Sequence, residues 1–405
     1  MSVREGLRMN KKNFFAMFIV LLITVILNIV AWNDPAFCDG YAAFVLPLWI
    51  NSFGRLCGMF SFSVGECMIV TGVILAVLAV VLGLVTVIFL LIPGLRKRTR
   101  GFRIFCEKYY LAMSWILIGV FTVLTLNCFI LYHTSDFSDK YQLTGKEEYT
   151  FEELCLLREQ VVATVNTLAK EVPRDENGQI VYPENMEETA ILSMQKLGER
   201  YDLLKGYYPE PKPLAASGFF SQQNMKGYFF PFSMEANYNA LMNEIHRPAT
   251  MCHELAHLKG FIQEDEANLI SYLACTQSDD IVFQYSGYLS ILNYIDNDFY
   301  AAVGSNKAVY KTYPAISKQV KKDNTFLHKE TWAAVEKKAV IQTQVVSQAS
   351  QTFVEKNLVM NGVTEGTLSY ANVVGLLLDY YYQNDPITEP VEYLASDTDL
   401  VIGEN

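Results

Sequence analysis

The chain has 405 residues, a hydrophobic content of 51% and a formal net charge of −11 at pH 7. Its length suits two domains or one large one. The excess of acidic residues argues against nucleic acid as a partner, because binding to phosphates requires clustered Lys and Arg. The eight cysteines form no Cys-x-x-Cys pair, so neither a zinc ribbon nor a thioredoxin-like redox motif is indicated.

Three apolar runs in the first third are long enough to cross a lipid bilayer, which takes about 20 helical residues. They cover residues 13–32, 67–92 and 109–132, and none of them contains Lys, Arg, Asp or Glu. The absence of intramembrane charges favours an anchor over a transport pathway. A cleaved signal peptide is the alternative for the first run, but its apolar stretch would be shorter and end in small residues. We therefore expect residues 1–133 to form a membrane module with three transmembrane helices.

Lys and Arg in the short loops predict the orientation of this module. Basic residues precede the first run and fill the loop between the second and third: Arg4, Arg8, Lys11, Lys12, Arg96, Lys97, Arg98, Arg100 and Arg103. Arg55 is the only basic residue in the loop between the first and second runs. We therefore expect a cytoplasmic N-terminus, with residues 134–405 outside the membrane. Cys38 and Cys57 share the outside loop and could form a disulfide.

The outer part of the chain has the pattern of a mostly helical domain. Thr150 and Glu153 form a capping-box pattern that predicts a helix to about Lys170. A second helical pattern covers about 184–204. Further helices are expected after the central motif, at about 263–275, 279–303, 332–360 and, beyond a break at Asn361–Gly362, 370–382.

A β-hairpin is expected just before the central motif. Phe219–Ser221 and Gly227–Phe230 flank a Gln-Asn-Met-Lys-Gly turn, and Pro231 restricts the second arm to the edge of a sheet. An edge strand beside a metal-binding helix could pair with an extended peptide. The alternative is a hairpin that only closes the core.

The central motif is His253-Glu254-Leu-Ala-His257. Two histidines four residues apart lie on one face of a helix, so both imidazoles can reach one metal ion. The intervening glutamate can then act as the general base for a metal-activated water. Pro248 fits the first turn of this helix, and Gly260 ends it. The alternative is a buried amphipathic helix whose histidines only form hydrogen bonds.

A catalytic zinc needs a third protein ligand, and Glu264, Asp265 and Glu266 are the candidates. Glu264 and Asn268 share a helix face, so Asn268 could orient Glu264 or a ligating histidine. Glu266 points about 200° away from Glu264. We favour Glu264 over Glu266, and the alternative for either is a solvated acid in the first turn of a helix.

These residues carry a resemblance. His253-Glu254-x-x-His257 followed by Glu264-x-x-Ala-Asn268 resembles the gluzincin metallopeptidase pattern, which implies that Glu264 is the third ligand. The interval between His257 and Glu264 is much shorter than in most gluzincins. Gln263 occupies the position at which metzincins have their third zinc ligand. Glutamine is a poor zinc ligand, which argues against a metzincin. With its three N-terminal apolar runs and the motifs His-Glu-Leu-Ala-His, Glu-Asp-Glu-Ala-Asn and Tyr285-Ser-Gly-Tyr288, nearly the whole chain resembles the bacterial domain-of-unknown-function family 3810. This resemblance implies a zinc-peptidase-like, multi-pass protein of a bacterial cell membrane.

We therefore expect a mainly α membrane protein with an extracytoplasmic, zincin-like domain over residues 134–405 and a small β-hairpin or edge strand. The expected function is that of a zinc metallopeptidase acting on proteins or peptides outside the membrane, with Zn²⁺ on His253, His257 and Glu264. Glu254 would be the general base. Tyr285 and Tyr288, and less directly His246, are candidates for stabilising the oxyanion. The alternatives are a non-catalytic receptor or scaffold, or a metallopeptidase-like sensor.

Overall fold

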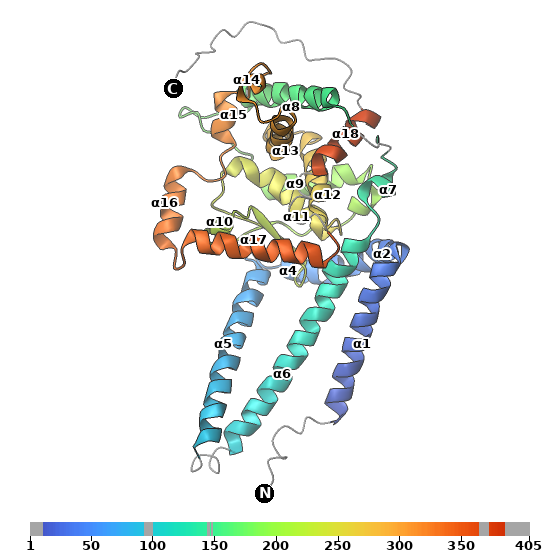
Figure 1. Cartoon of the computed structure of the whole chain (residues 1–405), viewed down its shortest axis with the longest axis vertical. Coiled ribbons are helices and arrows are strands. Elements are labelled where there is room, and N and C mark those ends of the chain that lie inside the picture. Colours follow the sequence, from blue (N-terminus) through green and yellow to red (C-terminus); the bar gives the residue numbers. More distant parts are fainter. Residues whose placement is uncertain (1–10, 93–99, 144–145, 147–148, 364–371, 385–405) are drawn as a thin grey trace.

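Three long helices stand side by side beneath a helical body formed by the described residues after His133 (Figure 1). They are α1 (Lys11–Asn33), α5 (Val64–Leu91) and α6 (Arg100–Leu124), and η4 (Thr125–Phe129) and η5 (Ile130–His133) extend the last of them. Each is long and apolar enough to cross a bilayer, so the prediction of three such helices is confirmed. The computed structural model describes residues 11–92, 100–143, 146, 149–363 and 372–384.

The basic residues used to predict the orientation lie at the ends of α1 and α6 that are far from the body (Figure 1). These ends carry Lys11, Lys12, Arg100 and Arg103. Five further basic residues lie outside the described residues: Arg4, Arg8, Arg96, Lys97 and Arg98. The orientation itself stays a prediction.

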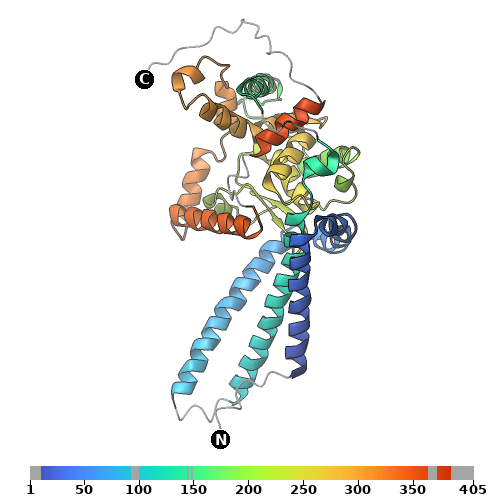
Figure 2. The same cartoon turned by 45° about the vertical axis from the view of Figure 1, so that its right-hand side comes forward.

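The connection between the first two spans is helical and lies across their upper ends (Figures 1 and 2). We call residues 34–62 the crossing segment. The Asp34 side chain starts it by accepting a hydrogen bond from the Phe37 amide. Cys38 and Cys57 are free thiols at its two ends, and about 19 helical residues would separate them by nearly 30 Å. The disulfide that their shared loop made possible is therefore not formed. The segment comprises α2 (Pro35–Gly40), η2 (Tyr41–Val45), α3 (Leu46–Trp49), η3 (Ile50–Gly54) and α4 (Arg55–Gly58).

The helices of the body follow the predicted order. The predicted capping box of Thr150 and Glu153 is present at the start of α8. The helices up to the C-terminal third are α7 (Phe137–Tyr141), α8 (Phe151–Glu171), α9 (Met186–Gly198), η6 (Asp202–Leu204), α10 (Ser217–Gln222), η7 (Glu244–His246), α11 (Arg247–Leu258), α12 (Glu264–Thr276) and α13 (Ile281–Ala302).

The C-terminal helices differ from the expectation at one point. The single helix expected over 332–360 is broken between Lys338 and Thr343, and Gln222 donates hydrogen bonds to the Ile341 carbonyl and the Thr343 hydroxyl at the break. Tyr370, the expected start of the last helix, lies outside the described residues. The helices here are α14 (Lys307–Tyr310), α15 (Lys318–Asp323), α16 (Lys329–Lys338), α17 (Thr343–Met360) and α18 (Val373–Asn384).

A three-stranded sheet of order β1-β3-β2 lies between the spans and α11. It comprises β1 (Lys212–Pro213), β2 (Gly227–Phe230) and β3 (Glu235–Tyr238), with β2 antiparallel and β1 parallel to β3. The prediction that Gly227–Phe230 is an edge strand is confirmed. The predicted partner was wrong, because Phe219–Ser221 belongs to α10 and the hairpin turns at residues 231–234 instead. Short apolar runs do not distinguish a strand from a helical turn by themselves.

A buried ion pair fixes the sheet to the second span. The Glu235 carboxylate lies 2.6 Å from Lys212 Nζ, and both side chains are buried. It also accepts hydrogen bonds from the amides of Val64 and Gly65 at the start of α5, while Lys212 Nζ donates to the Cys57 carbonyl. The sheet, the crossing segment and α5 therefore share one hydrogen-bonded junction, and this junction sets the position of β2.

Candidate metal centre

The motif helix α11 begins and ends as the sequence predicts. Pro248 lies in its first turn, and Gly260, two residues after its end, has a φ of +98°. A Cβ at position 260 would lie 2.9 Å from the Leu46 side chain, so glycine also permits close packing on the crossing segment. The tight connection lets α12 begin at Glu264, only a few residues after α11 ends, and the two helices pack against each other.

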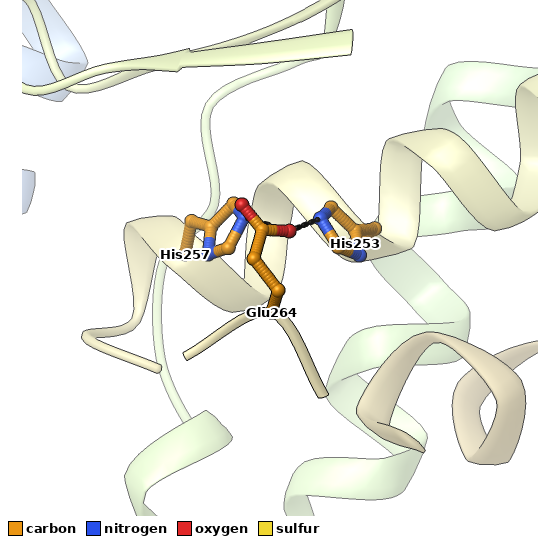
Figure 3. A group of neighbouring side chains, drawn as sticks. All are labelled: His253, His257 and Glu264. Atoms are coloured by element: carbon orange, nitrogen blue, oxygen red, sulfur yellow. Dashed lines mark ion pairs between the residues drawn. The ribbon is translucent and has the colours of Figure 1, made fainter. Parts of the chain in front are cut away.

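Three side chains from these helices converge on one point (Figure 3). His253 Nε2 lies 3.1 Å and His257 Nε2 lies 3.7 Å from Glu264 Oε2. The three potential ligand atoms all lie within 4.8 Å of one another. A tetrahedral zinc site with bonds of about 2.0–2.2 Å places its ligand atoms roughly 3.3–3.5 Å apart. The donor set is that of a zinc site with three protein ligands, and both distances from Glu264 Oε2 lie close to this spacing.

Neighbouring groups orient both imidazoles. His257 Nδ1 lies 2.8 Å from the Phe261 carbonyl oxygen, and an N–H donated there leaves Nε2 free to accept a metal. The Asn268 side chain lies near His253 and favours the protonated form of its ring, in keeping with its position one turn after Glu264. Such partners fix the tautomer and the ring orientation of metal-binding histidines.

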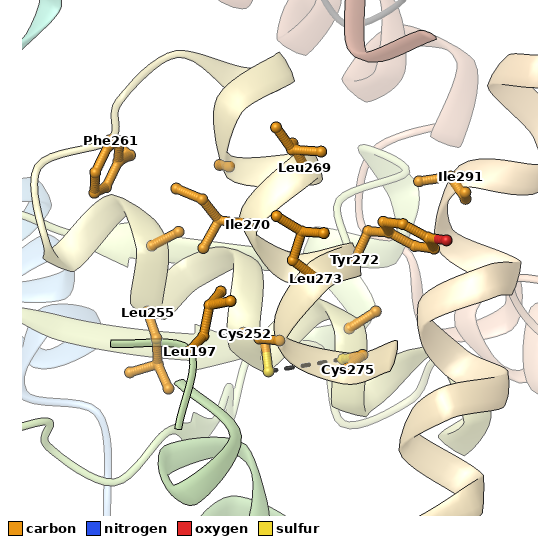
Figure 4. Packing of buried hydrophobic residues seen from close by; sticks show 14 of the residues in the cluster. Leu197, Cys252, Leu255, Phe261, Leu269, Ile270, Tyr272, Leu273, Cys275 and Ile291 are labelled. Carbon is orange, nitrogen blue, oxygen red and sulfur yellow. Dashed lines mark hydrogen bonds between the residues drawn. The ribbon is translucent and has the colours of Figure 1, made fainter. Parts of the chain in front are cut away.

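The back of α11 is held in the core, so the ligands stand on a rigid support (Figure 4). Leu255 is fully buried, and Leu269 and Leu273 of α12 belong to the same hydrophobic cluster. Cys252 and Cys275 meet across this interface as free thiols, with their sulfur atoms 3.7 Å apart. The rigid packing of α11 on α12 fixes the spacing between the two histidines and Glu264.

The charges of the cluster favour an ion pair when no metal is bound. Burial alone would lower the pKa of His257, but the Glu264 carboxylate outweighs it and raises this pKa to about 9. Burial also opposes ionisation of Glu264, yet hydrogen bonds from both histidines hold its pKa well below the usual range. The pKa of His253 is lowered by burial and by the nearby His257 charge.

The proton on His257 predicts a pH-dependent zinc affinity. At neutral pH this residue is protonated in the metal-free protein, so zinc must displace one proton. We expect the apparent dissociation constant for zinc to fall about tenfold per pH unit from pH 6 to pH 8, because the pKa of His257 lies above this range. Competition with a chromophoric chelator measures this slope. A constant affinity over the same interval would contradict the ion pair.

Glu254 lies between the cluster and the edge of the sheet. Its buried carboxylate faces the Phe229 amide of β2, which favours the ionised form. Burial raises the pKa of Glu254 to about 8. The Asn239 amide donates to the Lys226 carbonyl, and hydrogen bonds alternate along an antiparallel pair, so the backbone groups of Gly227 and Phe229 point away from β3. The free edge of β2 therefore faces the carboxylate expected to act as the base.

Gly227 is the residue that permits this approach. A Cβ at this position would overlap the Glu254 carboxylate and lie 2.7 Å from Thr250 Cγ2. We expect Gly227→Ala to destabilise the protein by about 1–3 kcal/mol through overpacking and to displace Glu254. Thermal unfolding of the purified full chain measures the first effect. Gly218→Ala is the matched control, because a Cβ there meets nothing within 4 Å. An unchanged midpoint in Gly227→Ala would contradict the close contact.

The structure does not bring the predicted oxyanion residues to the cluster. The Tyr285 hydroxyl donates to the Asp323 carboxylate at 3.0 Å. The Tyr288 ring packs on Tyr272, with ring centroids 5.4 Å apart. Both tyrosines point elsewhere because nearness in sequence does not determine which face of α13 meets α12. His246 is buried at the start of α11, two helical turns before His253, and we find no role for it in the cluster.

Other tyrosines, which the sequence did not single out, lie at the cluster instead. The Tyr294 phenol of α13 interacts with Asn268 and Glu264. Tyr132, at the end of the third span, interacts electrostatically with Glu264. The alternative third ligand, Glu266, points away and accepts a hydrogen bond from the Phe137 amide. The geometry therefore favours Glu264 as the third ligand.

The fold and the site define a mainly helical protein with three apolar helices of bilayer length and a His-Glu-x-x-His helix in its body. The chain belongs to the family described as "Protein of unknown function (DUF3810)", whose model matches residues 41–378. The resemblance noted in the sequence is thus confirmed at the level of the family. The match includes α11, α12 and the crossing segment from Tyr41 onward. Comparison with curated proteins and with solved structures gives no match.

Proposed function

We propose that this protein is a membrane-anchored zinc metallopeptidase that hydrolyses peptide bonds on the extracytoplasmic side of a bacterial cell membrane. The observation that carries the proposal is the convergence of His253, His257 and Glu264, with the Glu254 carboxylate beside them. Three ligands of this kind leave a fourth position open, as catalytic zinc sites require. A zinc ion bound there would supply a Lewis acid and an activated water.

Glu254 is the residue that would move the proton. Its carboxylate lies against Gly227 on the side of the β2 edge that β3 does not use. With a pKa of about 8 in the metal-free protein, it already holds a proton near neutral pH, and a nearby cation would lower that pKa. It would accept the proton of the attacking water and return it to the leaving amine. Tyr294 is better placed than Tyr285 or Tyr288 to assist at the developing oxyanion.

The free edge of β2 would bind the substrate backbone. Gly227 and Phe229 present amide and carbonyl groups that β3 does not use, and an extended peptide can pair with such an edge. Because Glu254 faces the Phe229 amide, a peptide that pairs with this edge would replace that contact and lie next to the proposed base. The orientation supports an outside location: Lys11, Lys12 and Arg100 stand at the ends of the spans opposite the body, as expected for cytoplasmic ends.

Metal removal and replacement test the enzymatic proposal. The purified full chain in detergent is incubated with a mixed peptide library, and new termini are identified by mass spectrometry. We expect cleavage that stops after chelation and returns when zinc is added back. A zinc-loaded, folded protein that cleaves no member of the library would count against hydrolysis.

One observation favours the alternative of a non-catalytic receptor, scaffold or sensor. The side chains of His253, His257 and Glu264 are only 16%, 10% and 20% exposed, so a substrate needs an opening movement to reach them. Complementation in cells separates the two functions. A receptor would keep its cellular role in Glu254→Gln, whereas a peptidase would lose it.

A further inference from the structure

The crossing segment has one face packed against the body and one face exposed. Its inner face includes Leu46 and Ile50, which are fully buried in the common core. Gly54 on the same face lies against Met234 of the β2–β3 turn. The body therefore covers this face, and the opposite face points away from it.

The opposite face is apolar and carries no charge over much of its length. Phe44 is 78% exposed and Met59 is 80% exposed. Residues 40–54 contain no Lys, Arg, Asp or Glu. The other large apolar side chains exposed along the segment are Val45, Leu48, Phe53, Leu56, Phe60 and Phe62. An uncovered apolar face of this size marks a site that another apolar surface covers.

A second helix with an exposed, largely apolar face lies at the same level; this face also carries Lys356, whose long side chain can extend its ammonium group to the headgroups. α17 runs along the base of the body, over the upper ends of the spans (Figures 1 and 2). Val345, Phe353 and Met360 lie on one helical face and are all exposed, Phe353 at 73%. Met360 lines a cavity together with Ile29 of α1 and Phe121 of α6, and this places the end of α17 against the two spans.

The positions of the two faces identify what covers them. The crossing segment continues directly into a span at each end, and α17 reaches the spans through Met360. The two helices lie on different sides of the third span (Figure 2). A single protein partner, including a second copy of this chain, would cover one face and leave the other in water. The bilayer leaflet around the spans meets both faces at once.

We propose that the exposed faces of the crossing segment and of α17 lie in the leaflet on the body's side, and that they hold the His253–His257–Glu264 cluster at the membrane surface. Helices with one apolar face bind in this way at the boundary between headgroups and acyl chains. Asn127 of the third span donates a hydrogen bond to the Pro231 carbonyl, directly after β2. The peptide-binding edge thus starts at the top of the spans.

The substrate class follows from this position, a step that rests on the proposed function. A site at the leaflet surface can reach a bond only a few residues from a membrane anchor. The substrates are therefore polypeptides tethered to the same leaflet by a lipid or a transmembrane helix, cleaved close to the anchor. A substrate tethered to the same leaflet has a high effective concentration at the site. Soluble extracytoplasmic proteins lack this tether, so they would be poorer substrates.

Photocrosslinking tests the leaflet contact without any need for activity. Benzoylphenylalanine replaces Phe44 or Phe353 in the full chain, which is reconstituted in phosphatidylcholine vesicles. Phe18 of α1 is the positive control, and Phe151 of α8, at the far end of the body, is the negative control; both are exposed. We expect lipid adducts at Phe44 and Phe353 comparable to those at Phe18 and at least about fivefold above those at Phe151.

Each other outcome of the crosslinking overturns the leaflet contact. Crosslinked dimers without lipid adducts would show that these faces join copies of the chain. Yields as low as at Phe151 would show that both faces meet water. Leu48 and Met360 supply second positions on the same two faces if a first variant unfolds.

Anchored peptides test the substrate class separately. A peptide that is cleaved in solution is attached to a vesicle lipid in two ways. The short spacer has about six residues and reaches at most about 20 Å, and the long spacer has about 30 residues. We expect the short-spacer peptide to be cleaved at least as fast as the long one. Cleavage of the long-spacer peptide alone would place the site away from the leaflet and refute the substrate class. Failure to cleave any peptide, with the lipid adducts present, would refute the proposed function and leave the leaflet contact standing.

Discussion

Glu254→Gln is expected to reduce the rate of peptide hydrolysis by about 10²–10⁴-fold, the usual contribution of a general base. Glutamine keeps the size of the side chain and can still interact with the Phe229 amide, but it cannot accept the proton of a water molecule. The two histidines and Glu264 are unchanged, so zinc content should be that of the unmodified protein. Initial rates on a cleaved peptide, measured together with zinc content, test this expectation.

The control for this variant is Glu176→Gln, which makes the same chemical change at an exposed position in a loop of the body. It should leave both the rate and the zinc content unchanged. Hydrolysis that persists in Glu254→Gln, with zinc bound and the fold intact, would remove Glu254 from the mechanism.

Glu235→Ala is expected to lower the free energy of unfolding by about 3–5 kcal/mol, the typical cost of leaving one member of a buried ion pair alone. The variant leaves the buried Lys212 ammonium without its counter-charge. It also removes the acceptor of the Val64 and Gly65 amides. Because this junction fixes the sheet to the second span, β2 should also lose its place beside α11.

Thermal unfolding of the full chain in detergent measures this effect. Glu210→Ala is the matched control, because Glu210 lies just before β1 and is exposed. Its expected change is within about 0.5 kcal/mol, as for most surface substitutions. A Glu235→Ala variant as stable as this control would show that the ion pair does not hold the sheet on the span.

Local signals explain what the sequence predicted correctly. The three spans follow from uninterrupted apolar length, and the bounds of α11 follow from Pro248 and Gly260. The spacing of His253 and His257 on one helical face needs no tertiary information. Glu264 could be favoured over Glu266 because their directions around α12 differ, and the structure places Glu264 with the histidines.

Contacts between distant parts of the chain explain what the sequence did not reveal. The strand that pairs with β2 is set by a turn after Pro231, whereas the pattern suggested one before Gly227. The carbonyl that orients His257 belongs to the backbone of Phe261. Every residue has such a group, so the residue types do not indicate which carbonyl lies beside the imidazole. Tyr294 differs from Tyr285 only in the face of α13 that it occupies, and packing decides which face meets the cluster.

Zinc content is the most direct measure of the central claim that His253, His257 and Glu264 form one metal site. After dialysis of the full chain against micromolar zinc and then metal-free buffer, we expect about one zinc ion per chain. His257→Ala and Glu264→Ala should retain less than about a tenth of that amount, whereas His328→Ala, at an exposed histidine, should retain all of it. A zinc-free unmodified protein, or full zinc in His257→Ala, would contradict the account.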